Sequence, residues 1–136
     1  MLKTAKGFTL IELIMVIVLL ALLAVVAIPQ YANLQNQASV AAEQGIVGGV
    51  RSGIYTRYAA NLAAGTVPAY PALLGGAVGA CTTANPCFAN VLSQGVTSNW
   101  TCLTAGLTYR GPSNATNIWT YTPTGATAGS FEQTTP

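Results

Sequence analysis

The sequence predicts an α+β protein in which one long N-terminal helix packs, along its amphipathic outer half, against a small antiparallel β-sheet head. An apolar run from Phe8 to Ile28 is followed by apolar residues at helical spacing as far as Leu62. After residue 98, short segments rich in Thr, aromatic and β-branched residues alternate with turn residues, which is typical of a meander. Such a helix cannot bury its own apolar stripe, so we expect the head to cover it.

Charged side chains are scarce in this chain. They make up 6% of the residues, against about 25% in an average soluble domain, and the mean hydropathy is +0.49. There is no His or Asp, and the acids are Glu12, Glu43 and Glu132. General acid–base chemistry needs His or paired carboxylates, and calcium needs several oxygen ligands. We therefore expect no catalytic residue, no cofactor and no metal site.

The apolar run from Phe8 to Ile28 is long enough for one bilayer crossing, because about 21 residues at about 1.5 Å each span about 31 Å. Lys3 and Lys6 precede the run, and the next basic residue is Arg51. The positive-inside bias then places the N-terminus in the cytoplasm and the later residues outside. Two simpler interpretations are a secretory signal peptide, cleaved after Ala27, and a plain single-span anchor.

Glu12 places a carboxylate inside this apolar run. A buried acid costs on the order of 2.5–3.5 kcal/mol at the centre of a membrane helix and less near an end. No basic residue lies in the segment to pair with it. Cleavage between Gly7 and Phe8 would create an α-amino group about one helical turn from Glu12. That cation would attract the acid within one chain or between neighbouring chains.

The stretch Lys6–Leu13 (KGFTLIEL) resembles the processing site of type IV pilins and of the related type II secretion pseudopilins, and is most like that of a pilin. The resemblance implies that a prepilin peptidase, which is also an N-methyltransferase, cuts the precursor after Gly7 and methylates Phe8. It also implies that Glu12 guides assembly.

Further implications concern the assembled state. Thr9 and Pro29 also fall at positions that the resemblance connects with assembly. The product would be a homo-oligomeric filament, built with minor pilins by an assembly platform and, indirectly, its ATPase. The subunit would begin in the bacterial inner membrane, with its N-terminus cytoplasmic, and end in an extracellular pilus.

The resulting hypothesis is a structural subunit of a type IV pilus, polymerised by helix bundling for adhesion, motility or DNA uptake. The alternative is a pseudopilin that forms a short periplasmic filament for protein export. A membrane-anchored binding module that never polymerises is a third class. The basic residues after the leader, Arg51, Arg57 and Arg110, are too few and too scattered to give a strong nucleic-acid signal.

These patterns divide the chain into four parts. They are a cleaved leader (1–7), a membrane or filament-core half of the helix (8–28), an amphipathic half of the helix (29–64) and a head (65–136). Pro29 should kink or loosen the helix, because it lacks a backbone N–H and clashes with the preceding turn. We expect the helix to end near Ala64, with Gly65 as its C-cap.

The amphipathic half has one apolar stripe at spacings of three, four or seven, formed by Val40, Val47, Val50, Ile54, Tyr58 and Leu62. The opposite face of the helix is polar. We assign to it Gln37, Glu43, Gln44, Arg51 and Arg57. Four glycines weaken this part of the helix by up to about 1 kcal/mol each: Gly45, Gly48, Gly49 and Gly53. Either they allow close approach of a neighbouring helix or of the sheet, or they provide flexibility.

In the head we expect a loop over Thr66–Pro86 and a short apolar piece of undetermined type over Phe88–Leu92. Three strands are then predicted, with a fourth to follow, at Asn99–Thr104, Leu107–Arg110, Asn117–Thr122 and Ala128–Phe131. An antiparallel sheet of these strands with one face on the helix resembles a pilin head.

Three cysteines follow the membrane segment: Cys81, Cys87 and Cys102. Outside the cytoplasm, one disulfide and one spare thiol is the simplest arrangement, but the sequence does not determine the pairing. The resembling family often closes a C-terminal loop with a disulfide. No cysteine follows Cys102 here, so any bridge lies earlier in the chain.

Overall fold

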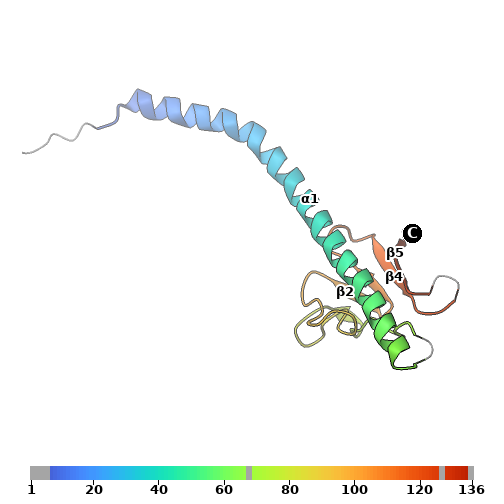
Figure 1. Cartoon of the computed structure of the whole chain (residues 1–136). Coiled ribbons are helices and arrows are strands. Elements are labelled where there is room, and N and C mark those ends of the chain that lie inside the picture. The colour runs from blue at the N-terminus through green and yellow to red at the C-terminus, as the bar shows by residue number, and fades with distance from the viewer. Residues whose placement is uncertain (1–6, 67–68, 126–127, 135–136) are drawn as a thin grey trace, which may run out of the picture. The chain divides into compact units, whose positions relative to one another are not determined.

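The computed structural model describes residues 7–66, 69–125 and 128–134, and it confirms the predicted α+β class. One helix and five strands follow in order (Figure 1): α1 (Leu10–Ala63), β1 (Gly79–Ala80), β2 (Thr101–Thr104), β3 (Thr108–Arg110), β4 (Ile118–Thr122) and β5 (Ser130–Thr134). The chain forms two compact units, Met1–Gln37 and Ala38–Pro136, and α1 contributes to both. The head therefore consists of the strands together with α1 from residue 38 onward.

The C-terminal end of α1 is closed as the sequence predicts. Gly65 has a φ of 70°, in the left-handed region. Its N–H donates to Leu62 O at 3.1 Å, and the N–H of Thr66 donates to Asn61 O at 2.9 Å. These two bonds form a Schellman motif, which satisfies carbonyl groups that the end of a helix leaves without partners. The helix ends at Ala63, one residue before the predicted end.

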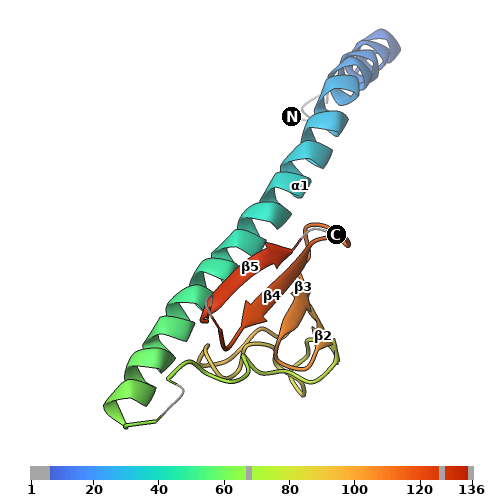
Figure 2. The same ribbon diagram turned by 90° about the vertical axis from the view of Figure 1, so that its right-hand side faces the viewer.

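The sheet is an antiparallel meander in the order β1-β2-β3-β4-β5. Figure 2 shows β5 beside α1, with β4, β3 and β2 successively farther from it. The three main predicted strands are confirmed, each starting one or two residues later than expected. The fourth is displaced, because the Gly129 N–H donates to Thr122 O at 2.7 Å and so delays the start of β5 to Ser130. The predicted loop over Thr66–Pro86 also contains β1, which pairs with β2.

The core lies between the inner face of the sheet and the second half of α1. Alternate residues of β4 point inward, so Trp119 and Tyr121 are buried. They share one apolar cluster with Val47, Val50 and Ile54 of α1. Burial of a large apolar side chain contributes about 1.5–3 kcal/mol, so this cluster holds the sheet on the helix.

The segment Phe88–Leu92 forms a turn rather than a strand. The N–H groups of Val91 and Leu92 both donate to Phe88 O, at 3.1 and 2.9 Å. Phe88 adopts a φ of 60° and is fully buried. Its ring lies 4.1 Å from that of Tyr109 and 5.3 Å from that of Trp100. This aromatic anchor holds the turn against the sheet.

Two tyrosines tie the preceding loop to the sheet. The hydroxyl of Tyr109 donates to Gly75 O, and that of Tyr121 donates to Pro71 O, both at 2.6 Å. Burial raises the pKa of Tyr109, with a smaller contribution from Cys102. Burial, followed by the effect of Tyr70, raises the pKa of Tyr121 to about 12. Both hydroxyls therefore stay protonated and act as donors at neutral pH.

The prediction that the head covers the apolar stripe on α1 is correct only for the middle of the stripe. Val47, Val50 and Ile54 are buried and Tyr58 is half-buried, its ring 4.4 Å from that of Tyr70. The two ends of the stripe are wrong, because Val40 and Leu62 are 48% and 59% exposed. The head covers the helix over a shorter length than the stripe extends.

The helix glycines differ in how closely other parts of the chain approach them. A Cβ at Gly53 would overlap the carbonyl oxygen of Val91, whereas a Cβ at Gly49 would make ordinary contact with Leu92 at 3.8 Å. Gly45 and Gly48 have nothing within 4 Å of that position. Close approach therefore explains Gly53, and the neighbour is the Phe88–Leu92 turn rather than another helix or the sheet.

This difference predicts opposite effects for one substitution at two positions. Gly53→Ala should lower the free energy of unfolding by about 1–3 kcal/mol, because the clash is with backbone and relaxes poorly. Gly48→Ala, the matched control, should raise it by up to about 1 kcal/mol, because Ala is the better helix former. Thermal or denaturant unfolding of the full chain in detergent measures both. Equal effects at both positions would contradict the packing role of Gly53.

Candidate functional site

The predicted processing point lies immediately before α1. Gly7 and Phe8 precede the helix, and Phe8 is 85% exposed. The rest of the predicted leader, including Lys3 and Lys6, lies outside the described residues. The Gly7–Phe8 bond is therefore followed within two residues by a regular helix, whose first residue is Leu10.

Thr9 and Glu12 form a capping box at the start of α1. The Glu12 N–H donates to Thr9 Oγ1 at 3.3 Å, and the Thr9 N–H donates to a Glu12 carboxylate oxygen at 3.5 Å. Leu13 N–H closes the first helical bond to Thr9 O at 3.2 Å. This reciprocal pattern satisfies two N–H groups that the start of a helix leaves without partners. An acid in the first turn also interacts favourably with the helix dipole.

From the sequence we expected only a cation as the partner of Glu12, so the capping role was not predicted. The signal was present, since Thr followed three residues later by Glu before an apolar run is the signature of a capping box. The carboxylate accepts a bond from the Thr9 N–H in its own chain, and the Thr9 hydroxyl lies at 3.5 Å. Pairing with a new terminal amine remains a prediction.

The first half of α1 presents apolar side chains on all sides. Every large apolar residue from Leu10 to Ile28 is between 42% and 76% exposed. Among the described residues, α1 is the one helix long and apolar enough to cross a membrane, with a mean hydropathy of 3.2 over its most apolar window. The helix continues through Pro29, which does not end it. At about 25 cal/mol per Å² of apolar surface, such a segment requires a cover of lipid or protein.

Glu43 is a structural residue of the head whose position was predicted wrongly from the sequence. It was assigned to the polar face of the helix, yet it is 2% exposed and buried in the head. Its Oε1 accepts from Trp119 Nε1–H at 2.7 Å, and its Oε2 accepts from the Ser113 N–H at 2.9 Å and from the Ser113 hydroxyl. The polar-face prediction was therefore wrong for Glu43.

The position of Glu43 follows from helical geometry. It precedes Val47 by four residues and Val50 by seven, so it continues the buried stripe by one turn. Room for its carboxylate comes from Gly111, where a Cβ would overlap the carboxyl group. An acid at an apolar spacing, combined with a Gly-Pro-Ser turn and a Trp in the sheet, was the available signal. What the sequence lacked was the spatial proximity of Ser113 and Trp119.

Arg51 reinforces the same junction from the edge of the helix. Its Nε–H donates to Phe131 O at 3.0 Å, and its guanidinium carbon lies 6.0 Å from the centre of the Trp119 ring. Arg51 thus holds β5 while Glu43 holds β4 and the turn before it. Together they fix the sheet on α1 with hydrogen bonds whose geometry apolar packing alone would not specify.

The cysteines agree with the expectation of one disulfide and one thiol. Cys81 and Cys87 are bonded, with their Cα atoms 5.4 Å apart, and Cys102 is a buried free cysteine. The Cys102 Sγ faces Thr104 O at 3.3 Å. The disulfide closes a short loop after β1, and the Cys87 N–H and C=O both bond to Val96. Among the described residues, no group of three or more His, Cys, Asp or Glu is placed to hold a metal ion.

These features define a class of protein: a pilin-like α+β architecture with an exposed apolar N-terminal helix. Residues 2–28 match the family model described as the prokaryotic N-terminal methylation motif. No curated protein and no solved structure matches the chain. The motif indicates a prepilin-like precursor of the pilin or pseudopilin kind, a structural subunit whose processing requires a prepilin peptidase. Together with the apolar helix, it is consistent with membrane anchoring before assembly.

The buried carboxylate generates a stability prediction. Glu43→Ala removes the acceptor of the buried Trp119 N–H and of the half-buried Ser113 donors, at a cost of about 1–3 kcal/mol for the buried donor and less for the others. Gln44→Ala changes the exposed neighbour on the same helix and is the matched control. Unfolding followed by Trp fluorescence measures the difference. If both variants have the same free energy of unfolding as the unmodified chain, Glu43 does not stabilise the head.

Proposed function

We propose that this chain is a structural subunit of a type IV pilus. It is made as a prepilin, held in the inner membrane by residues 8–28, cut after Gly7 and methylated at Phe8. It then polymerises by bundling of the apolar helices. The observation that carries this proposal is the match of residues 2–28 to the methylation motif, together with the exposed apolar side chains of the part of α1 that the match includes.

The energetics of assembly follow from that exposed segment. Lipid covers the apolar side chains of residues 10–28 before assembly, and helices of neighbouring copies cover them afterwards. Because both environments exclude water, transfer between them needs no exposure of the apolar surface. The heads, from residue 38 onward, would then form the exterior of the filament. The chain supplies the interfaces, and the motor is external.

Glu12 contributes in two successive states. In the precursor, the capping box gives its carboxylate a hydrogen bond from its own chain, which lowers the cost of placing an acid at the membrane. After cleavage, the α-amino group of Phe8 adds a positive charge close to the same helix end. Pairing of Glu12 with the amine of an adjacent copy would favour the docked position over other positions along the helix.

The alternative function is a pseudopilin of a type II secretion system. The observation that keeps this alternative is the same motif, since it occurs in precursors of both kinds. The two functions differ in where the polymer lies, outside the cell or in the periplasm.

The proposal predicts a defined mature N-terminus. Mass spectrometry of the protein from sheared surface filaments should find a terminal peptide that begins with methylated Phe8, because the peptidase would cut after Gly7. Gly7→Leu should leave the precursor uncut in the membrane, while Gly45→Leu, an open position on the helix, should be processed normally.

Two results would decide against this account. A mature chain that starts at Ile28 would show a cleaved signal peptide. A processed subunit that is absent from sheared filaments, with loss of protein export on its deletion, would show a pseudopilin instead.

A further inference from the structure

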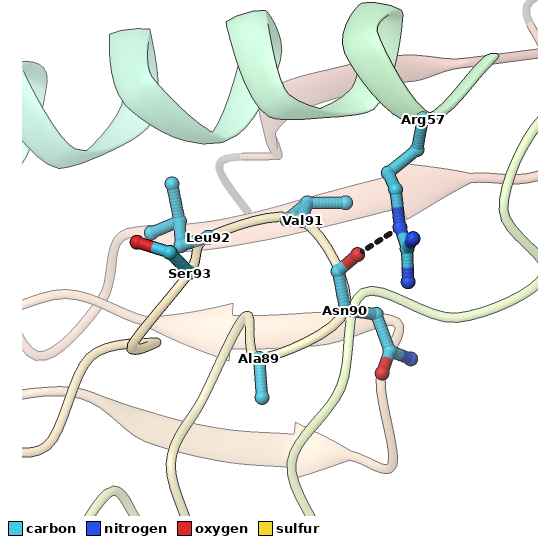
Figure 3. A pocket seen from close by; sticks show the side chains of 6 residues that line it. All are labelled: Arg57, Ala89, Asn90, Val91, Leu92 and Ser93. Carbon is cyan, nitrogen blue, oxygen red and sulfur yellow. Dashed lines mark hydrogen bonds between the residues drawn. The ribbon is translucent and has the colours of Figure 1, made fainter. Parts of the chain in front are cut away.

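Arg57 lies on the surface of the head, between two hollows. One, of about 270 Å³, is lined by Arg57 and residues 89–93 (Figure 3). The other, of about 410 Å³, is lined by Arg57, Asn61, residues 71–73 and Asn90. Arg57 and Asn90 therefore form the boundary that the two hollows share.

The Arg57 side chain is held in place by the neighbouring turn. Its Nε–H donates to Asn90 O at 2.6 Å. Asn90 is fixed in turn, because its N–H donates to Leu74 O at 3.0 Å and its Nδ2 donates to Leu73 O at 2.9 Å. The bond to Asn90 uses only Nε–H, so the two terminal amino groups make no hydrogen bond to another described residue, and Figure 3 shows the guanidinium beside Asn90 at one end of the first hollow. A fixed guanidinium of this kind suits a carboxylate, which it binds with two hydrogen bonds.

One carboxylate of this chain is suited to that site. The sequence has three acidic residues. Glu12 belongs to the capping box and Glu43 is buried against Trp119. Glu132 is exposed, and it lies on the outer face of β5 because its neighbour Phe131 points into the core. Its cross-strand neighbour on β4 is the uncharged Thr120.

Arg57 and β5 lie on opposite flanks of the buried helix stripe. At 3.6 residues per turn, Arg51 and Arg57 are about 120° apart around α1, with the buried Ile54 midway between them. Arg51 reaches β5, whereas Arg57 reaches the turn that contains Asn90. The head thus presents a free acid on one side of α1 and a fixed guanidinium on the other.

We propose that the Arg57 hollow is an interaction surface for a second copy of this chain, and that it receives the Glu132 carboxylate of that copy. This inference rests on the proposed polymerisation and adds the contact between heads. Because donor and acceptor lie on different flanks, the contact is head-to-tail rather than two-fold symmetric, and it repeats from copy to copy. Contacts of that kind generate open helical polymers. A single surface ion pair is weak, but this one has a pre-positioned arginine and recurs at every subunit.

The test uses full-length chains that carry exchanged charges. Arg57→Glu alone and Glu132→Arg alone should each reduce the yield of sheared filaments at least about tenfold, because like charges would meet at every contact. The double variant Arg57→Glu with Glu132→Arg should recover most of the yield. Thr124→Arg adds a positive charge at an exposed position after β4, outside β5 and the hollow, and should leave the yield unchanged. Membrane levels of each precursor report folding.

Cross-linking identifies the contact itself. With Arg57→Cys and Glu132→Cys in one chain, a short bismaleimide reagent, which forms a thioether with each thiol and spans a gap too wide for a disulfide, should give a ladder of covalent multimers from filaments, and each single variant should not.

The outcomes separate the two proposals. Normal filaments from both charge variants, or no rescue together with no ladder, would overturn the Arg57–Glu132 contact while leaving the pilus subunit intact. Failure of the unmodified chain to polymerise at all would overturn the proposed function and this contact with it.

Discussion

The exposed apolar half of α1 is the constraint on which the rest of the molecule depends. Its side chains from Leu10 to Ile28 face outward on all sides, and water is the one environment that they cannot occupy at low free energy. A bilayer before the proposed assembly and a bundle of like helices after it would both satisfy this constraint. The capping box of Thr9 and Glu12 lets the helix begin directly after the proposed cleavage point. A single segment can thus serve as membrane anchor and as filament core.

The head solves a different problem on the same helix. Apolar contacts are non-directional, so they leave a sheet more freedom to shift along a helix than hydrogen bonds do. Glu43 removes this freedom, because its two carboxylate oxygens bind Trp119 of β4 and Ser113 of the preceding turn. Gly111 leaves room for the acid, and Gly53 leaves room for the Phe88–Leu92 turn. The polar anchor therefore specifies a register that burial alone would not fix.

The sequence predicted best what depends on local pattern. The apolar run, the Gly65 cap and three strands follow from spacing and turn residues that lie close together in the chain. The errors, and the disulfide pairing that the sequence left open, concern how segments of the chain fold onto one another. Glu43 was assigned to the polar face by its charge, although its spacing from Val47 placed it on the buried one. β1 is too short to have a pattern of its own, and the Cys81–Cys87 pairing depends on how the loop folds after β1.

A high-resolution map of the polymer tests the central claim most directly, because that claim concerns what covers the apolar half of α1. The account predicts that residues 8–28 lie in the interior of sheared filaments, packed against the same residues of other copies. The Glu12 carboxylate should lie within ion-pair distance of a Phe8 amino group. A map in which this segment lies on the outside, or in which Glu12 faces away from every N-terminus, would contradict the account.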